Sequence, residues 1–269
     1  MIFEATRIGA TSYQESGAMA PLCQAILRTA FLGIYLFLLF LCLALLVPHL
    51  GASPPQPGGE EIVEIIGKME AAVAAVKDYQ TETEVREYRD GRLVDTKRFL
   101  YSFKKPNHIR IDLETPHPGM VLVYPNEGGK VVVEPFGWAR FLRLHLPPDS
   151  GVLMTSAGQR IDQTDLGLLV QNMAHSLTDR RHGEIMLSEE DGLLCLEVMA
   201  ENHFRPNVLT RYRFLIDEKR WLPVEVQERT PEGMLQREVI FRSLRTSIGI
   251  PDTFFQIDGR SGEDGRSNR

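Results

Sequence analysis

The chain has 269 residues, 43% of them hydrophobic, and carries a formal net charge of −6. A chain this acidic is a poor candidate for binding nucleic acid, because phosphate groups are bound by basic surfaces. Of the three cysteines, only Cys195 follows the hydrophobic segment described next. The chain after that segment therefore cannot form an internal disulfide.

Residues 30–47 contain no charged side chain. As a helix they would be about as long as the hydrocarbon core of a bilayer is thick, which predicts a segment that enters a membrane. Arg7 and Arg28 precede this segment, whereas the first charges after it are acidic. Positively charged residues next to a membrane segment stay on the cytoplasmic side. We therefore expect residues 1–29 to remain cytoplasmic and the chain after the segment to be exported.

The sequence allows two fates for this segment. It can stay as a transmembrane anchor in the inner membrane, or it can serve as the core of a signal peptide cleaved after Ala52, removing residues 1–52. Translation from Met19 instead of Met1 would give a signal peptide of conventional length. In each case, the domain that follows is expected on the far side of the membrane.

The rest of the chain is expected to form one domain between a linker and a tail. Residues 48–59 are rich in Pro and Gly and are typical of a linker. Residues 60–258 carry helical and strand periodicities, interrupted by a polar loop at residues 147–160. Residues 259–269 have no apolar side chain to bury, so we expect them to be disordered.

Two amphipathic helices are predicted within this domain. Residues 60–79 and 164–177 both repeat apolar side chains at spacings of three and four. Glu60 and Glu61 suit the first turn of the first helix, and Thr164 is a candidate N-cap for the second. The apolar stripe of the second helix consists of Leu166, Leu169, Val170, Met173 and Leu177.

From Tyr79 onward the apolar period changes to two, which is typical of strands. The stretch Phe99–Leu113 alternates large apolar side chains with polar ones on both sides of Pro106, and Asp90-Gly91 predicts a tight hairpin turn. Further strands are predicted at residues 119–124, 131–136, 141–146, 183–188, 193–201, 209–217, 222–229 and 235–244. We therefore predict an α+β fold, in which one highly curved antiparallel sheet of about ten or eleven strands has helices covering its concave face.

Residue types used in catalysis are present, but they do not occur at the spacings that known metal-binding or catalytic motifs require. The histidines are scattered, with no pair at metal-binding helical spacing, and neither a nucleophile elbow nor a phosphate-binding loop occurs. We expect no catalytic residue, no metal site and no cofactor. An enzyme on the same scaffold is the weakest alternative, with Glu114, His117 and His145 as the residues to test.

Two further side chains allow more than one interpretation. Cys195 lies within an apolar strand pattern, which favours a small core residue over a reactive thiol. Trp138 is either an aromatic residue that binds a partner or a hairpin side chain that covers the edge of the sheet.

The order of helix, strands, helix and strands resembles that of the LolA-like carriers of outer-membrane lipoproteins, and several short motifs add to the resemblance. These are Gly91–Leu93, Lys104–Asp112 (KKPNHIRID), Pro135–Phe136 and Ile250–Asp258 (IPDTFFQID). Residues 79–258 resemble still more closely a bacterial family known only as domain of unknown function 1571.

This resemblance implies a half-open β-barrel on the periplasmic side of the cell envelope. Its helices would enclose an apolar cavity that shields the acyl chains of a lipoprotein or lipid. The cavity-lining residues it implies are Tyr79, Val85, Phe99, Tyr101, Phe103, Ile109, Ile111, Leu113, Leu122 and Tyr124. The helical cover it implies consists of Leu166, Leu169, Val170 and Met173.

In the carrier family, a basic residue just before the strand-breaking proline hydrogen-bonds the helical cover and keeps the empty cavity shut. Lys105 is the candidate for this latch, in a position where the carriers have Arg. Because lysine lacks the planar fork of arginine, we expect a weaker latch. A carrier that retained residues 30–47 could not diffuse, so the alternative is a membrane-anchored sensor or interaction module with a membrane-protein partner.

Overall fold

The computed structural model describes residues 58–178, 183 and 185–257. The predicted membrane segment, most of the predicted linker and the predicted tail lie outside the described residues. Among the helices within these ranges, none has both the length and the apolar character needed to cross a membrane.

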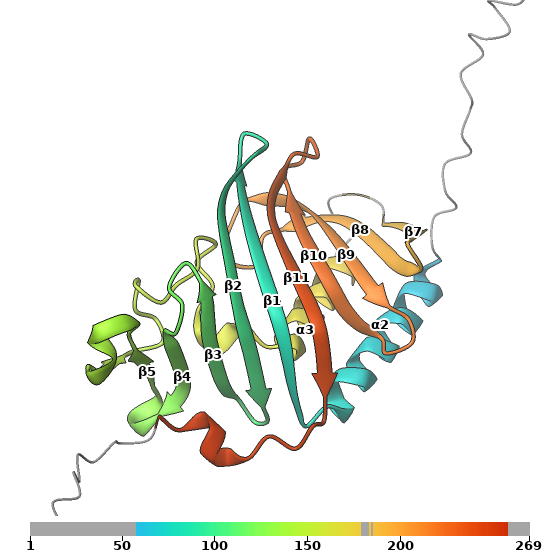
Figure 1. Cartoon of the computed structure of the whole chain (residues 1–269). Coiled ribbons are helices and arrows are strands. Elements are labelled where there is room, and N and C mark those ends of the chain that lie inside the picture. Colours follow the sequence, from blue (N-terminus) through green and yellow to red (C-terminus); the bar gives the residue numbers. More distant parts are fainter. Residues whose placement is uncertain (1–57, 179–182, 184, 258–269) are drawn as a thin grey trace, which may run out of the picture. The chain divides into compact units, whose positions relative to one another are not determined.

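Eleven strands form one antiparallel sheet in the order β6-β5-β4-β3-β2-β1-β11-β10-β9-β8-β7 (Figure 1). Strands β1 to β6 form one meander and β7 to β11 another, and the two join where β1 pairs with β11. The sheet does not close on itself, because β6 and β7 are its two edges. The strands are β1 (Asp78–Arg89), β2 (Arg92–Lys104), β3 (His108–Thr115), β4 (Val121–Asn126), β5 (Lys130–Glu134), β6 (Leu144–Leu146), β7 (Met186–Glu190), β8 (Leu193–Glu201), β9 (Leu209–Asp217), β10 (Leu222–Arg229) and β11 (Leu235–Thr246).

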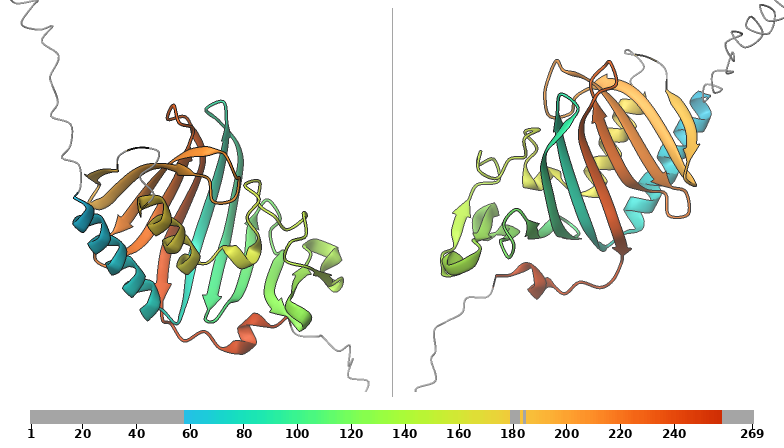
Figure 2. Two further views of the ribbon diagram at one scale, coloured as in Figure 1. Left: turned by 180° about the vertical axis from the view of Figure 1, so that it is seen from behind. Right: turned by 45° about the horizontal axis from the view of Figure 1, so that its top comes forward.

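Two α-helices, α2 (Gly59–Ala75) and α3 (Leu166–Thr178), lie against the same face of the strongly twisted sheet (Figure 2). We call this the inner face. The helices contact each other, and they contact β10 and β8, which belong to the second meander. The described residues also form four short 3-10 helices: η1 (Glu127–Gly129), η2 (Gly137–Phe141), η3 (Ile161–Gln163) and η5 (Asp252–Phe255). The predicted α+β class with one large antiparallel sheet is confirmed for these residues.

The hairpin between β1 and β2 turns where the sequence predicts. Asp90 and Gly91 both have positive φ angles, of 52° and 72°. A two-residue turn of this kind matches the twist of the flanking strands, and Asp-Gly tolerates it well. This turn and the register shift between Glu87 and Tyr88 together set the pairing in which Tyr79 lies opposite Phe103.

Several sequence-based boundaries need correction. The helix predicted at 60–79 ends at Ala75, because β1 begins at Asp78. The strands predicted at 119–124 and 131–136 are Val121–Asn126 and Lys130–Glu134. The strand predicted at 141–146 is reduced to Leu144–Leu146, because the chain turns at Gly137 (φ 65°) and forms η2. The strand predicted at 183–188 is Met186–Glu190. The cap of α3 is Asp165, whose Oδ1 accepts hydrogen bonds from the backbone N–H groups of Gly167 and Leu168, since a carboxylate caps at least as well as a hydroxyl.

The core lies between the helices and the inner face. One cluster packs α2 and α3 against strands β8 to β11, with Met69, Met173, Leu196, Phe214 and Ile216 almost fully buried. We call this the closed region. A second cluster continues along the inner face to β1, β2, β3 and β5, and it contains the start of α3.

The outer face is covered by charges and by the end of the chain. Arg86 bridges Glu84 on its own strand β1 and Glu238 on the neighbouring β11, at 2.7 and 3.0 Å. Residues 247–257, which we call the terminal strap, run back to β3 and β4, where Ile250 and Phe255 bury Val123. The apolar side chains of the sheet that remain available to a ligand are therefore those of the inner face.

Candidate functional site

All ten residues predicted to line a cavity lie on the inner face. Strand register places Tyr79 opposite Phe103, Phe103 opposite Ile109, and Ile109 opposite Tyr124. Since side chains alternate between faces along each strand, the other predicted positions share this face. Their role as a lipid-binding lining stays a prediction.

Tyr79, Tyr101, Phe103 and Ile109 are buried in packed core rather than at a surface. The ring of Tyr79 stacks on those of Tyr101 and Phe103, with centroids 5.8 and 5.2 Å apart. These side chains fill the inner face at the end where the helices meet it.

The two tyrosines also hold the start of α3. The backbone N–H of Leu166 donates to Tyr79 Oη at 2.9 Å, and Tyr101 Oη lies 3.0 Å from Thr164 Oγ1. Burial raises the pKa of both tyrosine hydroxyls, so they stay neutral. Through these contacts the sheet positions the helix that covers it.

A second group of predicted residues is only partly buried. It occupies the middle of β2, β3 and β4, beside a cluster that contains Ile161 of η3 and Leu166 at the start of α3, with Leu153 packed against it. The more extensive helix-to-sheet contacts among the described residues are those of α2 with β10 and of α3 with β8. We call this group the part-covered face. Its members are Phe99, Ile111, Leu113, Leu122 and Tyr124.

The four predicted residues of the helical cover divide between the two clusters. Leu166 is buried over Tyr79 and Tyr101, whereas Val170 and Met173 are buried in the closed region. Leu169 is partly buried and packs against both clusters. Helix α3 therefore runs from the boundary of the part-covered face into the closed region.

Lys105 lies at the C-terminal end of α2. Its Nζ donates hydrogen bonds to the carbonyl oxygens of Val73 and Ala74, at 3.1 and 2.7 Å. The last carbonyl groups of a helix have no partner within it and carry partial negative charge, so a cation there is favourable. Lys105 links the end of β2 to the cover; a latch that opens for a ligand stays a prediction.

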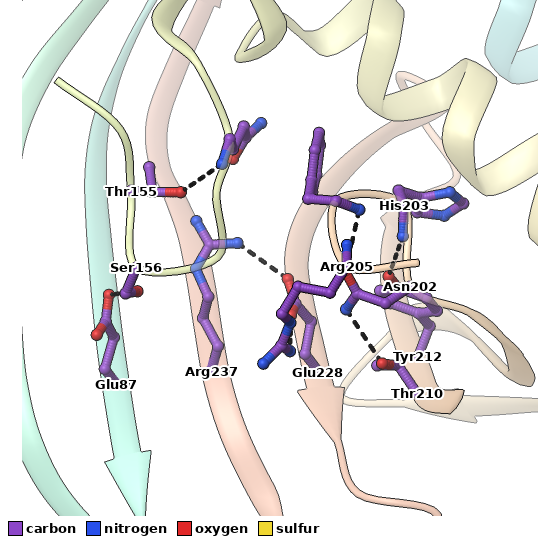
Figure 3. A network of polar contacts seen from close by, with 12 residues as sticks. Glu87, Thr155, Ser156, Asn202, His203, Arg205, Thr210, Tyr212, Glu228 and Arg237 are labelled. Atoms are coloured by element: carbon purple, nitrogen blue, oxygen red, sulfur yellow. Dashed lines mark hydrogen bonds and ion pairs between the residues drawn. The ribbon is translucent and has the colours of Figure 1, made fainter. Parts of the chain in front are cut away.

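The inner face becomes polar beyond Val85 (Figure 3). Glu87 lies opposite Arg237, Arg237 opposite Glu228, and Glu228 opposite Tyr212. Arg237 Nη1 donates to Glu228 Oε1 at 2.9 Å, with only 12% and 7% of these side chains exposed. We call this row the polar end.

Several polar atoms at this end have hydrogen-bonding capacity left over. Among the described residues, Glu228 Oε2 and the Nε atoms of Arg237 and Arg205 are buried with no hydrogen-bond partner. Arg205 Nη2 stands 3.7 Å from Glu228 Oε2, too far for a hydrogen bond. A buried ion pair that keeps unused polar atoms can accommodate the polar group of a ligand.

His203 joins the polar end to helix α3. Its Nε2 lies 2.9 Å from Ser176 Oγ, and its ring stacks on Tyr212 with centroids 5.2 Å apart. Burial lowers the pKa of His203, with a smaller contribution from His175, and Glu228 opposes the shift. The imidazole is therefore neutral near pH 7.

The polar end was missed in the sequence, although its signal was present. Arg237 follows the same alternation as Val239, and Glu228 the same as Val226, so a charged residue stands in phase with the core positions on each strand. A charge in phase with a buried apolar row indicates either a buried pair or a site.

Other candidate residues lie apart from this face or in ordinary packing. Among the described residues, no group of three or more His, Cys, Asp or Glu side chains could hold a metal ion. Cys195 is a buried thiol whose pKa is raised by burial. His117 stacks on Phe136, with centroids 4.8 Å apart. Trp138 is 84% exposed, so it does not cover the edge of the sheet.

Comparison with known proteins gives structural likenesses only. No protein-family model and no curated protein matches the chain. Among solved structures, the chain is similar to a DUF1329 family protein from Desulfovibrio piger (12% identity, TM-score 0.40, covering 74% of this chain and 97% of that one). It is similar to the Mycobacterium tuberculosis lipoprotein LppX (8% identity, TM-score 0.43, covering 72% and 99%). It is also similar to a LolA superfamily protein from Nitrosomonas europaea (10% identity, TM-score 0.36, covering 72% and 97%).

Proposed function

We propose that this protein binds the acyl chain of a lipid or lipoprotein on its part-covered face, at the periplasmic side of a cell envelope. One observation carries the proposal: five large apolar side chains share the inner face of β2 to β4 and stay only partly buried, away from strands β8 and β10, which α3 and α2 contact most. A few strands away, the same face is closed by α2 and α3.

The chemistry of the face suits a hydrocarbon ligand. Leaving an acyl chain in water costs about 0.8 kcal/mol for each methylene group, so a protein that holds it must offer a continuous apolar surface. Phe99, Ile111 and Leu122 come from three adjacent strands, which lie about 5 Å apart. A chain lying across them would contact all three.

The polar end provides a place for the other part of such a molecule. Lys97 is two residues from Phe99 on the same face and pairs with Glu87 and Asp95 at 3.6 and 3.2 Å. The buried Arg237–Glu228 pair continues the row. An amphiphile whose chain lies on the part-covered face would thus direct its polar group toward charged side chains.

The residues that pack over the part-covered face would have to move for an acyl chain to enter. The loop that carries Leu153 and η3 packs on the part-covered face, while Lys105 holds the end of α2. We expect movement of that loop to expose the face while the closed region stays packed. Whether the protein then acts as a carrier or as a fixed acceptor depends on the fate of residues 30–47.

Labelling of the full chain with a photoactivatable fatty acid tests the proposal. We expect crosslinks in peptides from β2, β3 and β4, in addition to the hydrophobic segment, which serves as an internal reference. Leu113→Asp places a charge on a residue outside both buried clusters and should reduce the β2–β4 crosslinks about tenfold.

Leu93→Asp is the matched control, because Leu93 is 54% exposed near the hairpin tip. It should leave labelling unchanged, and circular dichroism should show that both variants are folded. Labelling confined to the hydrophobic segment, or equal labelling of Leu113→Asp and the parent, would disprove the proposal. A stable membrane-protein partner captured without lipid would instead favour the anchored sensor or interaction module.

A further inference from the structure

The connection between β5 and β6 carries an exposed apolar surface that the proposed function does not use. Trp138 is 84% exposed and Phe141 is 72% exposed, and their ring centroids are 6.1 Å apart. Both belong to η2, beside the edge of the sheet near β5 (Figure 1). We call this feature the η2 turn. Phe136 and Leu142 in the same connection and Leu144 at the start of β6 are also exposed.

Packing within the described residues does not explain why these apolar side chains are exposed. The chain turns outward at Gly137, whose φ of 65° suits glycine, and η2 follows directly. Exposing a large aromatic side chain forgoes the roughly 2 kcal/mol that its burial would contribute. Clustered exposed aromatic residues indicate a surface that meets an apolar partner.

The charge of the connection between β5 and β6 indicates what kind of apolar partner this surface would contact. Between Glu134 and Asp149 there is no acidic residue, whereas Arg140 and Arg143 are basic, in a chain whose net charge is −6. Basic residues next to aromatic ones are the combination that favours the surface of an anionic bilayer. Trp in particular accumulates at the boundary between headgroups and acyl chains.

We propose that the η2 turn docks onto the interface of an anionic lipid bilayer, with Trp138 and Phe141 entering the boundary between headgroups and acyl chains. This inference is independent of lipid binding on the part-covered face. Because β5 and β6 continue the sheet from β4, such docking would hold that side of the sheet next to the membrane.

The two tryptophans of the chain allow a direct test. The variant Trp221→Phe leaves Trp138 as the single tryptophan, and Trp138→Phe leaves Trp221, whose ring lies 4.4 Å from Lys68 Nζ near helix α2. Each full-length variant is reconstituted into vesicles of phosphatidylethanolamine and phosphatidylglycerol. Part of the lipid carries bromine near the headgroup end of its acyl chains, which quenches tryptophan fluorescence on contact.

We expect Trp138 to be quenched about twofold more than Trp221, with a shift of its emission to shorter wavelength. Replacing phosphatidylglycerol with phosphatidylcholine, or raising salt from about 0.1 M to about 1 M, should weaken the quenching. Phe141→Ser in the Trp221→Phe background should weaken it too, while leaving the circular dichroism spectrum unchanged. Equal quenching of the two tryptophans, or none for Trp138, would overturn the inference.

Discussion

The closed region and the part-covered face are built from the same alternating strand pattern, yet they differ in what lies over them. In the closed region, Phe214 and Leu196 are sealed beneath α2 and α3. On the part-covered face, Phe99 and Ile111 have the same orientation but keep part of their surface exposed. The comparison teaches that the cover, and not the strand pattern, separates ordinary core from a candidate site.

The sharpest test of this difference is a matched pair of substitutions. Phe214→Ala should lower the free energy of unfolding by about 3 to 5 kcal/mol, because it leaves a cavity in sealed core. Phe99→Ala should cost about half as much, since its ring is only partly buried. Chemical unfolding of the full chain in detergent, followed by circular dichroism, measures both. Equal losses would mean that the two regions do not differ in packing.

The polar end allows a second test, which compares the stability of the buried ion pair with that of apolar side chains at the same positions. Arg237→Leu removes the hydrogen-bonding partner of the buried Glu228 carboxylate, leaves only Arg205 Nη2 at 3.7 Å, and should cost about 3 kcal/mol. The double variant with Glu228→Leu should recover most of that loss, because the uncompensated charge is gone. If the double variant is as unstable as Arg237→Leu, the pair is not the source of the effect.

Substitution of Lys105 tests the link between the end of β2 and helix α2, and we expect it to change stability less than the substitutions above. Lys105→Met removes two hydrogen bonds to the end of α2 at an exposed position, so we expect a loss of about 1 kcal/mol or less. The loss should be local, with faster amide hydrogen exchange in the last turn of α2 and no change in α3. Lys105→Arg should restore protection. Uniformly faster exchange in both helices would argue against a local link.

The smallest expected effect is a pH dependence from His203. Because its pKa is lowered in the folded state, the unfolded chain binds the proton more readily, and stability falls as the pH drops below the ordinary value of about 6.5. The unfolding temperature of the parent should therefore fall more between about pH 7 and about pH 5 than that of His203→Gln. Parallel curves would show that His203 titrates normally.

Local sequence signals were sufficient for much of the fold. The Asp90-Gly91 turn, the second helix, strands β8 to β10 and the first helix up to Ala75 lie where periodicity and turn chemistry place them. The same signals could not tell how much of each apolar side chain would be covered, because periodicity identifies a shared face and not the element that packs on it. Thus Tyr79 and Phe99 had the same pattern but have different burial.

The contacts that define the candidate site depend on long-range pairing. The ion pair of Arg237 and Glu228 requires that β10 and β11 be in register, and the exposure of Trp138 follows from the turn at Gly137. A sequence pattern of β-type residues at 141–146 predicted a strand there, but the preceding turn takes Phe141 out of it. Such competition between a turn and a strand is decided by tertiary context.

The pairing of β1 with β11 has a consequence for how the chain folds. Arg245 donates a hydrogen bond to Gln80 across 165 positions of sequence, so the earliest strand to be synthesised is joined to the latest. Until that late segment arrives, both meanders expose an unpaired central edge, which is a template for aggregation. Truncation before Leu235, which removes β11, would therefore leave two unfinished half-sheets rather than one slightly shorter protein.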